Sequence, residues 1–273
     1  MAHSAIGSGE TPADPIALDL VDIQRNVVRA LPVDKACYYF IRITNPGGFR
    51  EFLAALLADK AATRDPGDRS FPCFSINIGF TCAGLERLQV NQAIIDSFPQ
   101  VFRDGMAARA DQLGDAGPSA APQYWDGWLG SADIHCVVCL SAAPASALGD
   151  LQTRLGLGQE PRWSGFEILH TESGEWLRDG DDRREHFGFR DGLGQPKVAV
   201  KWSPAAGDLV DARENLVAAG EFILGYYDED KYRQPNPIDP AMARNGTYMV
   251  FRKLAQDVAG FRQFIKDHAR SRD

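Results

Sequence analysis

Apolar and polar positions alternate in several short stretches rich in aromatic and β-branched residues, a pattern typical of strands. Four of these stretches predict the strands of one domain: CYYFIRI at 37–43, FPCFSINIGFT at 71–81, DIHCVVCLSA at 133–142 and GFEILHTESGEWL at 165–177. Between the first two, apolar residues recur at helical spacing, which indicates a helix over 45–64. A further helix is expected over 144–158, where a glycine ends the pattern.

The second and third strands are separated by a short helix at 82–90 and by 97–115, where a loop leads into a helix that ends near Gly114. The resulting order, β-α-β-(α)-β-α-β, predicts an α+β fold of the ferredoxin-like type, and we assign residues 21–180 to it. Residues 1–20 have no regular pattern and are expected to form a flexible arm. The stretch 181–243 is irregular but rich in aromatic residues and glycine, so it is expected to be a functional loop region and not a disordered one.

The C-terminal stretch resembles the start of the first domain in its pattern of a strand followed by a helix. A strand is predicted over 245–254 and a helix over 255–271, which indicates an incomplete second ferredoxin-like unit at 244–273. Such a pair leaves a strand edge and an apolar helix face uncovered, which soluble proteins normally avoid. The apolar set consists of Val250, Phe251, Leu254, Val258, Phe261, Phe264 and Ile265.

Composition narrows the classes of partner. The chain has 273 residues, is 44% hydrophobic and 24% charged, and carries a formal net charge of −8. An acidic chain is a poor partner for nucleic acid or for an anionic membrane surface, so neither is expected. No apolar run has the length of a membrane span, and the first residues lack a signal-peptide pattern, so we expect a cytoplasmic protein.

The spacing Cys136–Cys139 spells a CxxC pair inside a predicted strand. Residues three apart on a strand point to opposite faces, so we expect two small core residues and neither a metal site nor a redox pair.

The stretch EHFGFRDGLGQP at 185–196 places one carboxylate, Asp191, among aromatic residues and glycines. An Arg-Asp-Gly sequence is also a common turn in which Asp caps its own backbone. Glycines on both sides let a backbone approach a flat ligand closely, so a binding role is the alternative.

The run GFRDGLGQP resembles the GxxDG signature of the dye-decolourising (DyP-type) haem peroxidases. Other stretches resemble the larger members of that family in the same order, from about residue 21 onward. They are DIQRNVV, FTCAGLERL (80–88), GMAARADQLGD (105–115), DIHCVVCLSA, GEFILGY (220–226) and RNGTYMVFRKLAQDV (244–258). The resemblance covers the N-terminal half of that family and implies a DyP-type fold, haem b as cofactor and reduction of hydrogen peroxide.

The resemblance also implies roles for residues of the motif. Asp191 corresponds to the distal acid–base residue, which takes a proton from the inner peroxide oxygen and returns it to the outer one. Such proton transfer typically contributes roughly 10² to 10⁴ in rate. Residues expected to contact the haem are His186, Phe187, Gly188, Phe189, Arg190, Gly192, Leu193, Gly194 and Gln195.

The chain departs from the family in its iron ligand. The family's proximal histidine and distal arginine lie in its C-terminal half, and no histidine here matches the proximal motif. The five histidines are His3, His135, His170, His186 and His268. We therefore expect a split peroxidase, in which a second polypeptide supplies the proximal histidine and the distal arginine and shares the haem. A small reducing substrate would then be oxidised.

Two alternatives remain open from the sequence. One is a haem-free binding or assembly module derived from the same fold, with Asp191 as a turn residue. The other is an unusual haem site in which His268 or a second copy of the chain ligates the iron.

Overall fold

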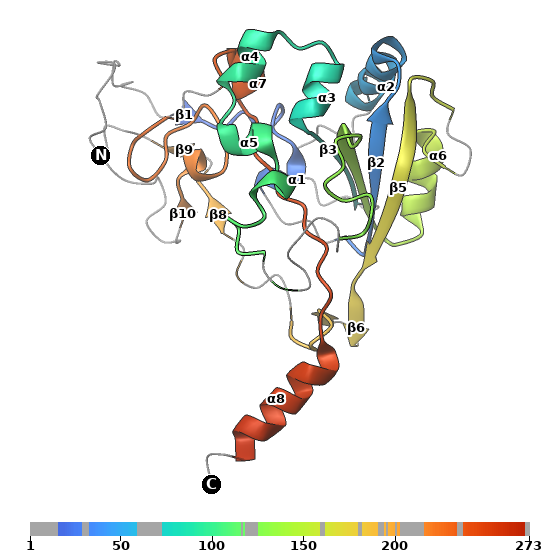
Figure 1. Ribbon diagram of the computed structural model, residues 1–273, viewed down its shortest axis with the longest axis vertical. Helices are drawn as coiled ribbons and strands as arrows, with labels where there is room; N and C mark the ends of the chain where they lie inside the picture. Colours follow the sequence, from blue (N-terminus) through green and yellow to red (C-terminus); the bar gives the residue numbers. More distant parts are fainter. Residues whose placement is uncertain are drawn as a thin grey trace.

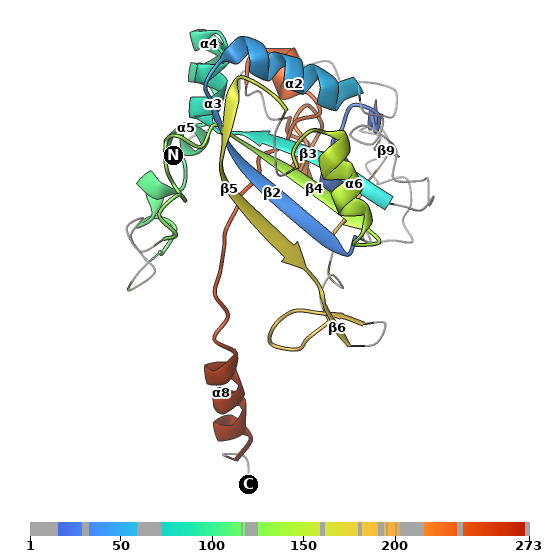
Figure 2. The same ribbon diagram turned by 90° about the vertical axis from the view of Figure 1, so that its right-hand side faces the viewer.

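A computed structural model describes residues 16–28, 33–58, 73–115, 117, 125–158, 162–179, 182–190, 194, 196–199, 201–202, 216–233 and 237–270. Its centre is an antiparallel sheet of four strands in the order β3-β4-β2-β5 (Figures 1 and 2). The strands are β2 (Lys35–Ile43), β3 (Cys73–Phe80), β4 (Cys136–Ala143) and β5 (Phe166–Glu175).

Two helices connect these strands in the ferredoxin-like way. Helix α2 (Pro46–Ala58) joins β2 to β3, and helix α6 (Ala147–Arg154) joins β4 to β5. Each connection skips one strand of the sheet, because β4 lies between β2 and β3 and β2 lies between β4 and β5. The predicted fold class is confirmed, with strand and helix bounds that differ from the expected ones by a few residues.

Both faces of β2 are apolar, and this shapes the domain. Its odd-numbered side chains, from Cys37 to Ile43, lie in the main core under α2 and α6 together with Phe49 and Phe52. Its even-numbered aromatic residues, Tyr38 and Phe40, face the other side, where they contact Phe251 of the C-terminal segment. The sheet is therefore covered by helices on one face and by loops and the C-terminal segment on the other.

The insertion between β3 and β4 is helical, as predicted, but it consists of several short helical elements. In place of the expected loop and single helix in 97–115, the structure has two short helical segments. Gly105 has a positive φ of 70° and ends the first segment, and turns follow the second. The elements of this insertion are α3 (Cys82–Arg87), α4 (Gln92–Ser97), α5 (Gln100–Asp104) and η1 (Ala107–Arg109).

The remaining elements are short, apart from the last helix. They are β1 (Ile16–Ala17), α1 (Arg25–Val28), β6 (Leu177–Asp179), β7 (Asp182–Arg184), β8 (Lys197–Val198), β9 (Lys201–Trp202), β10 (Leu216–Val217), η4 (Ala219–Glu221), α7 (Pro240–Ala243) and α8 (Val258–Arg270). In the described part of the chain, no helix has both the length and the apolarity that crossing a membrane requires.

A second cluster ties the N-terminal segment to residues 216–246. Leu18 and Ile23 pack with Ile223 and Tyr226. The Tyr226 hydroxyl donates to Asn245 Oδ1 at 2.7 Å, and the Asn245 amide donates to Asp22 at 2.7 Å. Asn245 is buried, so these bonds satisfy its polar side chain and fix the point from which the C-terminal segment departs.

The predicted strand at 245–254 is not part of a sheet. In the described residues, the segment between α7 and α8 has no strand partner and runs along the body of the protein to α8 (Figure 2). The predicted helix is present as α8, which extends away from the body (Figure 1). Side chains that remain exposed on this segment and helix are Tyr248, Met249, Val250, Leu254, Phe264 and Ile265.

The two cysteines of the CxxC spelling lie on β4 and face opposite sides, as expected. Cys136 is fully buried in the main core. Cys139 is only partly buried, and burial raises its pKa to about 11 despite a hydrogen bond with Tyr38 that lowers it.

Two helical glycines provide a matched test of the packing. A methyl group on Gly84 in α3 would overlap the backbone carbonyl of His135, whereas Gly149 in α6 has open space at the same position. We expect Gly84→Ala to destabilise the fold by about 2 kcal/mol or more, because backbone must shift. Gly149→Ala should stabilise it by about 0.5–1 kcal/mol through helix propensity. Urea unfolding of both variants measures the difference, and equal stabilities would contradict this packing.

Candidate functional site

The Gly-rich motif follows the β6–β7 hairpin and is closed at its base by backbone pairing. Asp179 pairs with Asp182 across the hairpin. Arg184 then forms an isolated antiparallel bridge with Arg190, so residues 185–189 form a closed turn. The residue that follows Arg190 is Asp191, so the turn leads directly into the expected acid–base residue.

The Glu185 carboxylate organises this turn. It accepts hydrogen bonds from the backbone N–H of Phe187 at 2.8 Å and of Phe189 at 2.7 Å. The Glu185 backbone also bonds Gly188 N–H at 2.9 Å and Phe189 C=O at 3.0 Å. Desolvation acts to raise the pKa of Glu185, but these N–H donors outweigh it and lower the pKa below its ordinary value.

Gly188 has a conformation that explains why glycine stands there. Its φ is +100°, in a region that side chains disfavour, and its carbonyl accepts from Arg184 at 2.8 Å. No heavy atom lies within 4 Å of the place where a Cβ would be. The turn therefore presents open backbone on one side.

Residues just before α8 and in its first turns hold the motif turn. Gln256 accepts from the backbone N–H of His186 at 3.2 Å and donates to Glu185 at 2.8 Å. The Phe261 ring lies 4.7 Å from the ring centroid of Phe187 and 5.8 Å from that of Phe189. Segments far apart in sequence thus meet at the motif.

The structure places six of the ten expected site residues. His186, Phe187, Gly188, Phe189 and Arg190 lie together in the turn or at its base, and Gly194 is exposed nearby in sequence. The other four lie outside the described residues; they are Asp191, Gly192, Leu193 and Gln195. Sequence reasoning missed Glu185 and Gln256, although an acid directly before a Gly-containing turn was a visible signal for the first.

The C-terminal segment reaches the motif because charges attach it to the body. Arg252 forms a two-pronged ion pair with Asp115, at 2.8 and 3.0 Å. Lys253 contacts Asp126 at 2.8 Å and Glu172 at 3.0 Å. Its hydrogen bond to Glu172 is the main reason that the pKa of this carboxyl is lowered. Together with the burial of Phe251, these contacts set the path of the chain towards Gln256.

His170 and His268 make local contacts. His170 stacks on Trp128, with ring centroids 4.1 Å apart, and contacts Glu172 at 3.1 Å. His268 contacts the backbone carbonyl and the ring of Phe264 within α8. The described residues contain no group of three or more His, Cys, Asp or Glu side chains placed to hold a metal ion.

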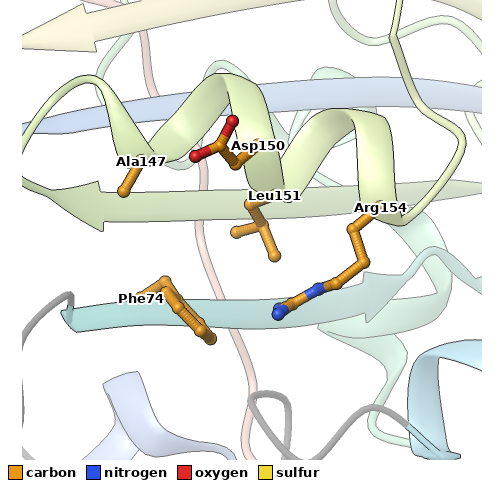
Figure 3. A pocket seen from close by; sticks show the side chains of 5 residues that line it. All are labelled: Phe74, Ala147, Asp150, Leu151 and Arg154. Atoms are coloured by element: carbon orange, nitrogen blue, oxygen red, sulfur yellow. The ribbon is translucent and has the colours of Figure 1, made fainter.

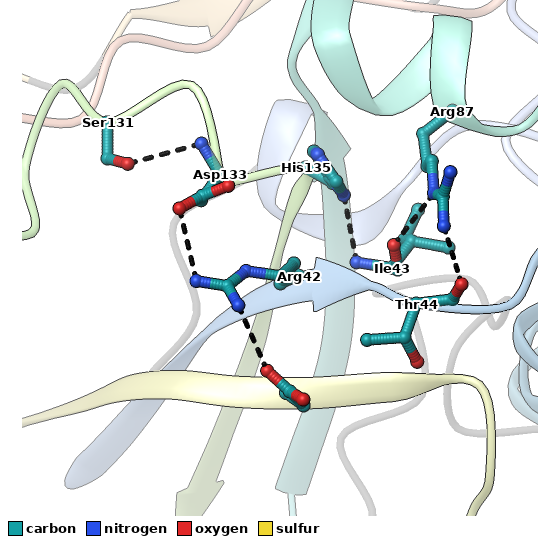
Figure 4. A network of polar contacts seen from close by, with 8 residues as sticks. Arg42, Ile43, Thr44, Arg87, Ser131, Asp133 and His135 are labelled. Carbon is teal, nitrogen blue, oxygen red and sulfur yellow. Dashed lines mark hydrogen bonds and ion pairs between the residues drawn. The ribbon is translucent and has the colours of Figure 1, made fainter.

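His135 belongs to a network that fixes the end of β2 (Figure 4). Its Nδ1 accepts from the Ile43 backbone N–H at 2.9 Å. Arg87 donates to the carbonyls of Ile43 at 3.0 Å and Thr44 at 2.6 Å. Burial, and then the positive charge of Arg87, lower the pKa of His135. The neutral ring is therefore the structural form.

A shallow pocket lies on the helix-covered side of the domain, between β3 and α6 (Figure 3). It is lined by Phe74, Ala147, Leu151, Asp150 and Arg154. The Arg154 guanidinium lies 4.7 Å from the centre of the Phe74 ring and so occupies part of this space. The pocket lies on the opposite face of the sheet from Phe251, and none of its lining residues belongs to the motif.

Comparison with known proteins agrees with the geometry. Residues 22–155 match the family model of the DyP dimeric alpha+beta barrel domain. The chain is a relative of the DyP-type peroxidases. A dye-decolorizing peroxidase of Mycena epipterygia is 28% identical over 92% of this chain and 44% of its own length. AauDyP1 of Auricularia auricula-judae is 29% identical over 93% of this chain and 46% of its own length.

The solved structures agree as well. The structure of an ancestral D-type dye decolorizing peroxidase superposes with a TM-score of 0.70 at 28% identity, over 92% of this chain and 53% of that one. The chain therefore spans about half the length of the DyP-type relatives it matches, and it corresponds to their N-terminal half. The resemblance inferred from the motif series is confirmed.

The hydrogen bond to His135 predicts a loss of stability in acid. The pKa of His135 is lower in the folded state than in the unfolded state. The contribution of this residue to folding stability is therefore present above the unfolded pKa of about 6.5 and is lost as pH falls through the folded pKa. Protonation would set an N–H against the Ile43 N–H. We expect His135→Asn, which keeps an acceptor that does not titrate, to flatten the fall in melting temperature below about pH 6.5. At pH 8 both proteins contain a neutral acceptor and serve as the reference. If the melting temperatures of the two proteins fell equally as the pH was lowered, the role given to His135 would be contradicted.

Proposed function

We propose that this chain forms the distal half of a haem peroxidase site, with Asp191 as the residue that moves the proton of hydrogen peroxide. The observation that carries the proposal is the closed turn at 185–190, which is built to hold the segment leading into Asp191 in one place. The relationship to the DyP-type peroxidases supports the reaction class.

The described residues of the motif fit one side of a flat, largely apolar cofactor. Phe189 is 60% exposed although it is aromatic. Gly188 and Gly194 both have open space where a side chain would stand, so a ring could approach their backbone. Haem b would supply the redox chemistry of peroxide reduction when bound. In this chain, Phe187 and Phe189 would exclude water, His186 and Arg190 would lie near the propionate charges, and Asp191 would hold and return the proton.

The rings of His135, His170 and His268 make local contacts within the body or within α8, so the proposal includes a complementary half that supplies the iron ligand. We propose that it is a second polypeptide that provides the proximal histidine and the distal arginine. Support comes from the apolar side chains left exposed on the C-terminal segment and α8. Their exposed fractions are 67% for Val250, 74% for Leu254 and 54% for Phe264. Several large apolar side chains left exposed in one segment are typical of an interaction site.

Purification of the tagged chain from its own cells tests the proposal, with the visible spectrum and the intact masses recorded on the same sample. A haem Soret band together with a second polypeptide would support both parts. A Soret band on a single, longer polypeptide would support the haem site and reject the separate partner. A sample that is colourless as purified, and that retains no haem once added haem has been washed away, would reject the peroxidase and favour a binding or assembly module.

Replacing the expected proton carrier should remove turnover and leave haem in place. We expect Asp191→Asn to lower the rate of peroxide reduction by roughly 10² to 10⁴, because the amide cannot take the proton. Stopped-flow mixing with hydrogen peroxide measures this rate, and the Soret band measures haem content. Asp230→Asn, at an exposed position outside the motif, is the matched control and should behave as the wild type. Equal rates in both variants would mean that Asp191 is a turn residue only.

A further inference from the structure

The motif turn is held by a residue from the distant C-terminal segment. Gln256 is separated from Glu185 by 71 positions in sequence, yet its amide contacts both Glu185 and the backbone of His186. One end of the amide accepts and the other donates, so the contact requires an amide and not a carboxylate or an ammonium. This pairing closes the set of donors around Glu185.

Each oxygen of the Glu185 carboxylate has a defined task. Oε1 accepts from Phe189 N–H, and Oε2 accepts from both Phe187 N–H and the Gln256 amide. A carboxylate that accepts several N–H bonds at once fixes all of the donors relative to one another. Loss of one donor therefore loosens the turn without unfolding the domain.

The path from this carboxylate to Asp191 is short and continuous. Glu185 fixes Phe189 through two hydrogen bonds: its carboxylate accepts from Phe189 N–H, and its backbone N–H donates to Phe189 C=O. The Arg184–Arg190 bridge then fixes Arg190, the neighbour of Asp191. Misplacement of a reacting group by about 1 Å can cost on the order of a hundredfold in rate.

We propose that Gln256 and Glu185 form a positioning pair, in which the C-terminal segment sets the geometry of the motif turn and thereby places Asp191. The catalytic part rests on the proposed function, whereas the structural part does not. Gln256 lies three residues beyond Lys253, which is paired with Asp126 and Glu172. Any partner that engages the exposed side chains of this segment would therefore act on the turn through the pair.

Hydrogen exchange of the turn tests the structural part on the purified chain. Gln256→Leu removes both amide contacts, and Gln256→Glu places a second carboxylate against Glu185. We expect exchange of the peptide that contains Phe187 and Phe189 to become about tenfold faster in both variants at pH 7, the effect of losing one hydrogen bond to a charged group. Gln263→Glu is the matched control. It too brings a carboxylate next to a carboxylate, that of Asp267, but within α8 and away from the turn.

The pH dependence separates positioning by this pair from a general loosening. In Gln256→Glu, protonation of one carboxyl restores a donor, so exchange relative to wild type at the same pH should return to normal near pH 4. His186 and Arg184 are the other ionisable side chains next to Glu185 in the chain, and they are the same in all variants. Gln256→Leu has no group to protonate and should stay fast. Wild-type exchange in Gln256→Glu at pH 7, or no recovery in acid, would overturn the pair.

The catalytic part is tested on the haem-loaded, partner-bound protein. We expect Gln256→Leu to lower kcat for hydrogen peroxide about tenfold with unchanged haem content and little change in KM, because Asp191 is displaced and not removed. Faster exchange with unchanged kcat would reject the positioning role. If the protein binds no haem, the proposed function fails by itself, and the exchange data still decide whether the pair holds the turn.

Discussion

The apolar character of both faces of β2 is the constraint on which the arrangement depends. A strand with large side chains on alternate positions needs cover on two sides, and the two helices of a ferredoxin-like unit provide it on one side only. Tyr38 and Phe40 therefore require a second cover, and Phe251 contributes to it, with ring centroids 5.6 and 5.0 Å from theirs. The C-terminal segment crosses the sheet at this point because burial of these rings is favourable.

Electrostatic contacts convert this apolar contact into a defined path. Arg252 and Lys253 follow Phe251 directly and meet three carboxylates from different parts of the chain, Asp115, Asp126 and Glu172. Isolated surface ion pairs contribute little stability, but a two-pronged arginine pair and a shared lysine restrict direction and register. The segment is thereby set so that Gln256 arrives at Glu185, and the packing of a strand in the sheet is linked to the geometry of the motif.

The sequence predicted those parts of the fold whose signals are local. Alternation in Cys37–Ile43 and helical spacing around Phe49 and Phe52 gave the sheet and its helical cover, because burial and periodicity coincide there. The strand expected near 245–254 was not found. Its residues have strand propensity, but a strand exists only where a neighbour offers backbone partners, and the described residues offer none. The helix boundaries expected near Gly105 were also wrong, because this glycine has a positive φ and interrupts the helical backbone.

The candidate site likewise has parts that local sequence signals predict and parts that depend on tertiary contacts. The glycines and aromatic residues of the motif were recognisable from their order, and the role expected of Asp191 came from the resemblance. Glu185 and Gln256 form their contact through tertiary structure, and no local pattern connects residues 71 positions apart. For the same reason, the geometry of the motif turn could not be predicted from the motif sequence alone. A short turn with a positive-φ glycine is adaptable when free, and it takes a defined geometry only when a second segment donates to the acid at its centre. The geometry of the turn is thus a property of the packed C-terminal segment as much as of the motif itself.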